Sequence, residues 1–82
     1  MKYMQINVSY KYKCTVSERE MTMSIGIIAN PELVDDDDIV RKVKGYIKGR
    51  LCKPNDGRIF IGVSGLELRI VLCSSRPMFD IG

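Results

Sequence analysis

Residues 35–53 read DDDDIVRKVKGYIKGRLCK, and they decide the fold because their apolar residues recur with the period of a helix. Placed at about 100° per residue, these apolar side chains fall on one broad arc. The arc consists of Ile39, Val40, Val43, Tyr46, Ile47 and Leu51. The stretch opens with aspartates and closes among cations, which is the charge order that a helix dipole favours. We therefore expect one helix that starts near Asp35 and lays this arc against a sheet.

Two segments before the helix alternate between apolar and polar residues, as half-buried strands do. In residues 4–16 the apolar face is Met4, Ile6, Val8, Tyr10, Tyr12, Cys14 and Val16. In residues 21–29 it is Met21, Met23, Ile25, Ile27 and Ala29. The polar residues 17–20 are short enough for a hairpin connection. Asn30 and Pro31 are expected to end the second strand, because proline removes a backbone donor.

Two more strands are expected after the helix. Residues 54–57 (PNDG) form a strong turn signal, and residues 58–63 alternate behind it. In this third strand we expect Ile59, Ile61 and Val63 to point inward, and Phe60 and Gly62 to point outward. Ser64 and Gly65 then fit a two-residue hairpin turn. A fourth strand, residues 66–73, follows with an inward face of Leu66, Leu68, Ile70 and Leu72. Residues 78–82 are either a tail or a short edge segment.

These segments predict a single α+β domain over residues 1–82. The expected order is ββαββ, with a mostly antiparallel four-stranded sheet and one helix packed on one face. The other face is expected to be solvated. The pattern does not decide the order of the strands within the sheet. The hydrophobic share of 45% and the charged share of 28% are ordinary for a globular domain.

The net charge of +3 is unevenly distributed along the chain. Residues 1–40 hold four Lys/Arg and seven Asp/Glu, whereas residues 41–82 hold nine Lys/Arg and three Asp/Glu. The first half therefore carries −3 and the second half +6. This dipolar pattern argues against a continuous basic stripe of the kind that nucleic-acid binding favours.

The aspartate run has two interpretations. It is either a first-turn acidic cluster that stabilises the helix dipole or an acidic knob that docks on a basic protein surface. Successive helical residues point in different directions, so Asp35, Asp36, Asp37 and Asp38 are not expected to converge on a metal ion. We expect neither a metal nor any other cofactor.

The cations of the same stretch also have two interpretations. They are Arg41, Lys42, Lys44, Lys48, Arg50 and Lys53. They could contact phosphates, or they could form a solvated face with the pairs Asp37–Arg41 and Asp38–Lys42. The acidic start of the helix argues against docking on an anionic membrane. The outer sheet face is expected to carry Lys11, Lys13, Arg69, Val71 and one aromatic, Phe60, which is too few for base stacking.

Catalysis is not expected. The chain has no histidine, which removes the commonest general base. Its three cysteines, Cys14, Cys52 and Cys73, have no C-x-x-C spacing, and free thiols in a reducing cytosol are the simplest interpretation. No apolar run of signal-peptide or membrane-spanning length is present, so we expect a cytoplasmic location.

In size, in layout and in its concentrated charge at residues 35–38 and 41–53, the chain resembles small α+β proteins with which phages inhibit bacterial defence, anti-CRISPR proteins among them. The resemblance implies a non-enzymatic inhibitor or adaptor that occludes a larger protein or ribonucleoprotein assembly, in the host cytoplasm if the chain is phage-encoded. From the charge pattern we expect the following partner-binding residues: Asp35, Asp36, Asp37, Asp38, Arg41, Lys42, Lys44, Lys48 and Arg50.

Two alternatives remain. One is a small nucleic-acid-binding protein that uses the basic half of the helix. The other is a structural subunit that assembles through sheet edges, since the long first strand is expected to offer an edge for homodimerisation.

Overall fold

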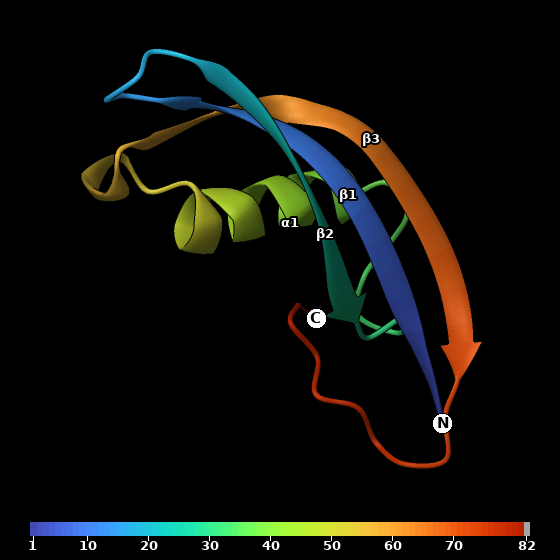
Figure 1. The fold of residues 1–82 in the computed structure, drawn as a ribbon. Coiled ribbons are helices and arrows are strands. Elements are labelled where there is room, and N and C mark those ends of the chain that lie inside the picture. Colours follow the sequence, from blue (N-terminus) through green and yellow to red (C-terminus); the bar gives the residue numbers. More distant parts are fainter. Residues whose placement is uncertain (82) are drawn as a thin grey trace.

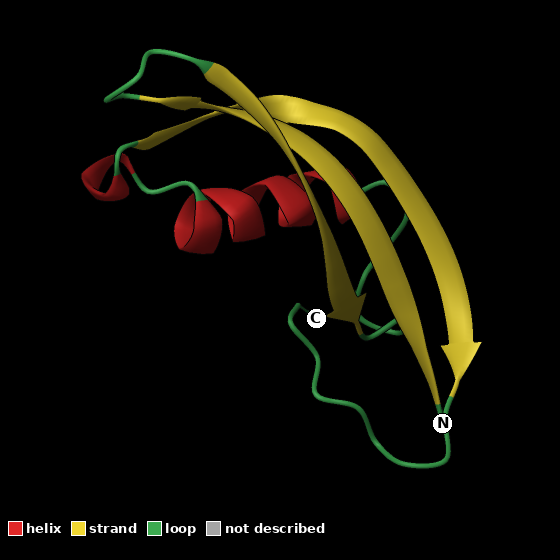
Figure 2. Ribbon diagram, viewed as in Figure 1, coloured by secondary structure: helices red, strands yellow, loops and turns green. Residues whose placement is uncertain are grey.

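The computed structural model describes residues 1–81 as a curved antiparallel sheet that arches over one helix (Figures 1 and 2). The strands are β1 (Lys2–Cys14), β2 (Glu20–Ala29) and β3 (Arg58–Leu72). Between β2 and β3 lie the helix α1 (Ile39–Tyr46), a π-helical turn η1 (Ile47–Leu51) that continues it, and a 3₁₀ turn η2 (Pro54–Asp56). The strand order is β2-β1-β3.

The chain is an α+β protein as expected, but the four-stranded ββαββ arrangement is wrong. The expected third and fourth strands are one continuous strand of 15 residues, β3, and Ser64 and Gly65 lie inside it. A two-residue hairpin turn needs left-handed backbone, and Gly57 is the one glycine with a positive φ among those that the structure describes. Ser64 instead sits in a β-bulge, where its hydroxyl donates to the carbonyl of Ser9 at 3.1 Å.

The first strand lies in the centre of the sheet. β1 pairs antiparallel with β2 on one side and with β3 on the other. The expectation that this strand offers a free edge is therefore wrong, and the two edges of the sheet are β2 and β3.

Two bulges change which side chains of β3 face the helix. Leu66 lies opposite Val8, but the register shifts so that Val63 lies opposite Tyr10 and Phe60 opposite Tyr12. Each bulge inserts one residue and so moves the following side chains to the other face. Phe60, expected to point outward, thus packs against the core, with its ring centroid 6.4 Å from that of Tyr10. Ile59 and Ile61, expected to point inward, are each 47% exposed.

The helix begins later than expected. Its first residue is Ile39, and residues 36–38 form a turn in which the Asp38 amide donates to the carbonyl of Asp35 at 3.0 Å. Ile39, Val43 and Ile47 are buried under the sheet as expected, whereas Val40 is 41% exposed.

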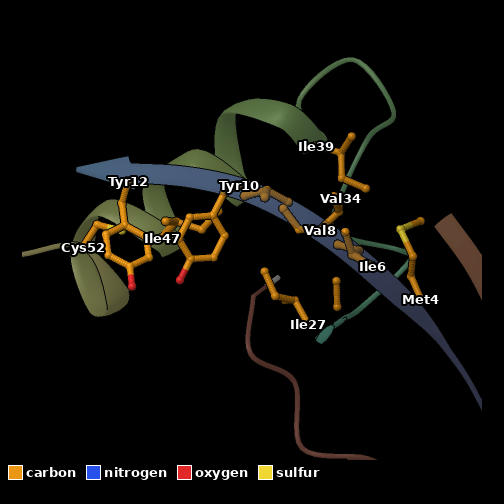
Figure 3. Close-up of a cluster of buried hydrophobic side chains, with 12 residues drawn as sticks. Met4, Ile6, Val8, Tyr10, Tyr12, Ile27, Val34, Ile39, Ile47 and Cys52 are labelled. Carbon is orange, nitrogen blue, oxygen red and sulfur yellow. The ribbon is translucent and has the colours of Figure 1, made fainter. Parts of the chain in front are cut away.

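The hydrophobic core lies between the sheet and the helix, and β1 supplies much of it (Figure 3). The buried residues are Met4, Ile6, Val8, Tyr10, Tyr12, Ile27, Ala29, Val34, Ile39, Val43, Ile47 and Cys52. The central position of β1 explains its share, because a strand with neighbours on both sides is covered most completely by a single helix. No helix in residues 1–81 has the length and apolar character needed to cross a bilayer.

The C-terminal segment closes part of the β2 edge. It leaves the end of β3 and runs to the end of β2, where Ile81 forms a parallel bridge with Ala29 (Figure 1). The Asp80 amide donates to the carbonyl of Ile28 at 2.6 Å, and the Ile28 amide donates to Asp80 Oδ2 at 2.8 Å. Of the two interpretations of residues 78–82, the edge segment is therefore the one the structure supports for residues 80–81.

Two substitutions in β3 test this register. Phe60→Ala should destabilise the fold by an amount approaching the lower end of the about 3–5 kcal/mol typical of a buried phenylalanine. Ile61→Ala should cost less than about 1 kcal/mol, because Ile61 is a half-exposed bulge residue. Urea unfolding of both variants measures the two free energies. A larger loss for Ile61→Ala than for Phe60→Ala would contradict the register.

Candidate interaction surface

The acidic end of the helix holds one ion pair and three solvent-facing carboxylates. Arg41 Nε donates to Asp38 Oδ1 at 3.0 Å, and Arg41 Nη2 donates to Asp38 Oδ2 at 2.8 Å. Asp35, Asp36 and Asp37 are exposed. Within the part of the chain that the structure describes, no three carboxylate or thiol groups are placed to hold a metal ion.

The helix start explains why the expected side-chain pairs are replaced. Because α1 begins at Ile39, Asp37 is not one helical turn before Arg41, and Arg41 pairs with Asp38 instead. Lys42 donates its Nζ to the carbonyl of Leu33 at 2.9 Å, which ties the helix to the preceding loop. Asp37–Arg41 and Asp38–Lys42 were therefore wrong as pairs.

The Asp38–Arg41 pair shifts the titration of both groups. Hydrogen bonding and charge from Arg41 lower the pKa of Asp38, and Asp38 raises the pKa of Arg41. A lowered carboxylate pKa means that the pair stabilises the fold above the unfolded-state pKa, and that this contribution is lost as pH falls through the folded-state pKa. Both side chains are well exposed, so salt should weaken the pair.

The basic end of the same surface lies along α1 and η1. Lys44, Lys48, Arg50 and Lys53 are all exposed. Lys48 Nζ lies 5.5 Å from the ring centroid of Phe60, and Arg50 Cζ lies 5.4 Å from that of Tyr46. Such cation–π contacts restrict where the two charges sit without neutralising them. These cations lie roughly 10–20 Å along the helix axis from the aspartates. We call the exposed charged side chains of residues 35–53 the charged helix surface.

The outer face of the sheet lacks the aromatic that was expected on it. Lys11, Lys13 and Arg69 are exposed there, but Phe60 lies on the helix side. A shallow hollow at the middle of this face has no aromatic residue in its lining. The lining residues are Asn7, Val8, Ser9, Ser24, Ile25, Gly26, Gly65, Leu66 and Glu67. The composition of this hollow gives bases nothing to stack on.

The thiols differ in their surroundings. Cys52 is buried, and burial raises its pKa; burial likewise raises the pKa of the neighbouring Tyr10. Hydrogen bonds with Ser17 lower the pKa of Cys14. All three cysteines are free. A buried, protonated thiol is a packing group, so Cys52 is not a candidate nucleophile.

Sequence reasoning missed an exposed apolar strip on β3. Leu68, Ile70 and Leu72 were expected to be inward, and they do lie on the helix side of the sheet, yet they are 42%, 54% and 81% exposed. We call these three residues the β3 strip. Relative lengths account for the exposure: a strand of 15 residues is about 50 Å along its path, whereas the 13 residues of α1 and η1 span about 20 Å.

Comparison of the chain with protein-family models, with curated proteins and with solved structures finds no match, so the surface is interpreted from its own residues.

Removal of the guanidinium should release the Asp38 carboxylate. Arg41→Gln is expected to raise the pKa of Asp38 towards the ordinary value for aspartate, and Lys44→Gln is expected to leave it unchanged. An NMR titration of the side-chain carboxyl carbons measures both. An unchanged pKa in Arg41→Gln would show that the pair does not form in solution.

Proposed function

We propose that this chain is a non-enzymatic binding protein that docks its charged helix surface on a larger protein or ribonucleoprotein assembly. It would inhibit or adapt that assembly by occupying a surface, in the manner of the small phage inhibitors that it resembles. The proposal rests on the position of Asp35, Asp36 and Asp37 relative to the helix.

The helix dipole does not account for these three carboxylates. The first turn of α1 contains no acidic residue, and only Asp38 occupies the cap position. The dipole stabilises charges within the first turn and falls off beyond it. Residues 35–37 precede that turn, and three adjacent carboxylates repel one another. A partner with a basic surface would relieve this repulsion on binding.

The basic end favours a partner that itself carries both signs of charge. A nucleic acid would be repelled by the aspartates of the same surface, whereas a protein can present a basic patch to them and an acidic patch to Lys44, Lys48 and Arg50. Complementary charge of this kind chiefly sets specificity and association rate. The lack of histidine in the chain supports a role that requires no general base.

The first experiment is capture of partners from host lysate with the tagged chain, with and without nuclease. A stoichiometric protein complex that survives nuclease is the expected result. The double variant Asp36→Asn/Asp37→Asn should then weaken binding of the purified partner by about tenfold or more, at little cost in thermal stability.

The matched control is Glu18→Gln/Glu20→Gln, which removes the same charge from two exposed residues, one in the connection between β1 and β2 and one at the start of β2. It should leave binding unchanged. Equal losses of binding in both double variants would contradict the proposal. Loss of all captured material on nuclease treatment, with affinity for free DNA or RNA that falls steeply as salt rises, would support the basic half as a nucleic-acid site instead.

A further inference from the structure

The backbone of β3 is open along its outer edge. Met1 and Cys73 exchange two backbone hydrogen bonds, from the Cys73 amide at 2.7 Å and from the Met1 amino group at 3.0 Å. In an antiparallel pair such bonded pairs alternate with non-bonded ones. The register from Lys2↔Leu72 to Val8↔Leu66 is regular. The even-numbered residues of this half of β3, namely Leu66, Leu68, Ile70 and Leu72, therefore direct their N–H and C=O groups away from β1.

Nothing in residues 1–81 pairs with those groups. The backbone hydrogen bonds outside the strand ladders and helices include none to Leu66, Leu68, Ile70 or Leu72. The β2 edge differs, because the Ile28 amide and carbonyl are both bonded to Asp80. The C-terminal segment thus leaves β3 and covers part of the opposite edge (Figure 1).

The half of this edge from Leu66 to Leu72 lacks the usual protection against pairing, because the two bulges of β3 lie before it, at Ile61 and Ser64. Natural edge strands carry proline or inward-pointing charges, or they are short. β3 has 15 residues and no proline, and the β3 strip places three branched aliphatic side chains beside the open backbone. Its charged residues in this half, Glu67 and Arg69, lie on the outer face.

We propose that β3 pairs antiparallel with β3 of a second copy of this chain, across a two-fold axis at Leu68, to form a continuous six-stranded sheet. This proposal is independent of the charged helix surface and goes beyond the binding role above.

Charge complementarity fixes the register. With the axis at Leu68, Glu67 of each copy faces Arg69 of the other, and this happens twice. These are non-hydrogen-bonded pairs, in which opposite side chains approach most closely. Moving the axis by one bonded pair, to Leu66 or Ile70, loses both ion pairs. An axis at Glu67 or Arg69 would keep the outward backbone groups paired but would set like charges against each other, Glu67 against Glu67 or Arg69 against Arg69.

The apolar side chains agree with this register on the other face. Leu68 faces Leu68 of the second copy, and Leu66 faces Ile70 twice. Three bonded pairs centred on Leu68 would exchange about six backbone hydrogen bonds. The aliphatic side chains of the β3 strip would then pack against those of the second copy instead of facing water. This packing accounts for aliphatic residues at an edge of a small sheet.

A charge-swap series tests the register by sedimentation velocity from micromolar to millimolar concentrations of the full chain. Glu67→Arg and Arg69→Glu should each raise the dimer dissociation constant by about tenfold. The double variant Glu67→Arg/Arg69→Glu restores both pairs with reversed sign, so it should return the constant to near the unsubstituted value. Lys13→Glu, an exposed outer-face charge on the central strand, is the control and should have no effect.

Amide hydrogen exchange supplies a second readout that a change in folding would not imitate. The amides of Leu68 and Ile70 should become protected as the concentration rises. Those of Ser24 and Gly26, which face the open part of the β2 edge, should not. A monomer at millimolar concentration, dimers indifferent to the single charge changes, or a double variant as weak as either single would overturn the proposal. The proposal would also be overturned if the chain stays monomeric and its β3 amides become protected only when a different protein is bound.

Discussion

A strand of 15 residues is about 50 Å long when measured along its curved path, and a helical segment of 13 residues is about 20 Å long, so one helix cannot cover this sheet. The rest of the structure follows from this mismatch. The molecule is elongated, with extents of 44 × 20 × 17 Å, and its core gathers where α1 and η1 lie under β1. The loop residue Val34 is buried in the same cluster as Met4 and Ile6, but nothing within residues 1–81 covers the end of β3, where Leu72 is 81% exposed.

The bulges in β3 reconcile a long strand with a compact core. A β-bulge bends its strand and increases the local twist. Ser64 and Ile61 are the inserted residues, and the sheet arches over the helix along this part of β3 (Figure 2). The bulge at Ile61 places Phe60 on the same face as Val63, where its ring approaches Tyr10 and lies under Lys48. The same irregularity therefore completes the core and positions a cation of the charged helix surface.

Sequence periodicity predicted the elements whose side chains are determined by burial. β1, β2 and the buried stripe Ile39, Val43 and Ile47 were expected. The inward positions at the far end of this hairpin were wrong, because Val16 lies beyond β1 and is 90% exposed, and Met21 and Met23 are 48% and 39% exposed. Periodicity also failed at Ser64 and Gly65, because a small polar dipeptide fits a hairpin turn or a bulge equally well. The choice depends on the pairing partner, and the central position of β1 gave β3 a full-length partner. The helix start was misplaced for a related reason: aspartates are favourable both in a first turn and in the turn before it.

The two candidate surfaces differ in how much of each could be predicted from the sequence. The sequence alone shows the run of four aspartates. The argument for a partner depends on where this run lies relative to the first residue of the helix, and only the structure gives that position. Periodicity could not predict that the β3 strip is exposed. Aliphatic residues on one face of a strand give the same alternating pattern whether that face is buried or exposed. Its exposure follows only from the strand order and from the length of the helix.

The two surfaces are compatible in one assembly. An antiparallel strand pair that continues a sheet has its two-fold axis perpendicular to that sheet, so both copies present the same face on the same side. In a dimer paired through β3, the two helices would flank the joined strands on one side, and the two charged helix surfaces would face the same way. A partner with repeated basic patches could then engage both, and the second contact would be intramolecular. Affinity would rise by the effective concentration of the second site without any new contact within each site. Monomeric variants at Glu67 and Arg69 would keep the single-site affinity and lose only this gain, so the two surfaces can be separated by experiment.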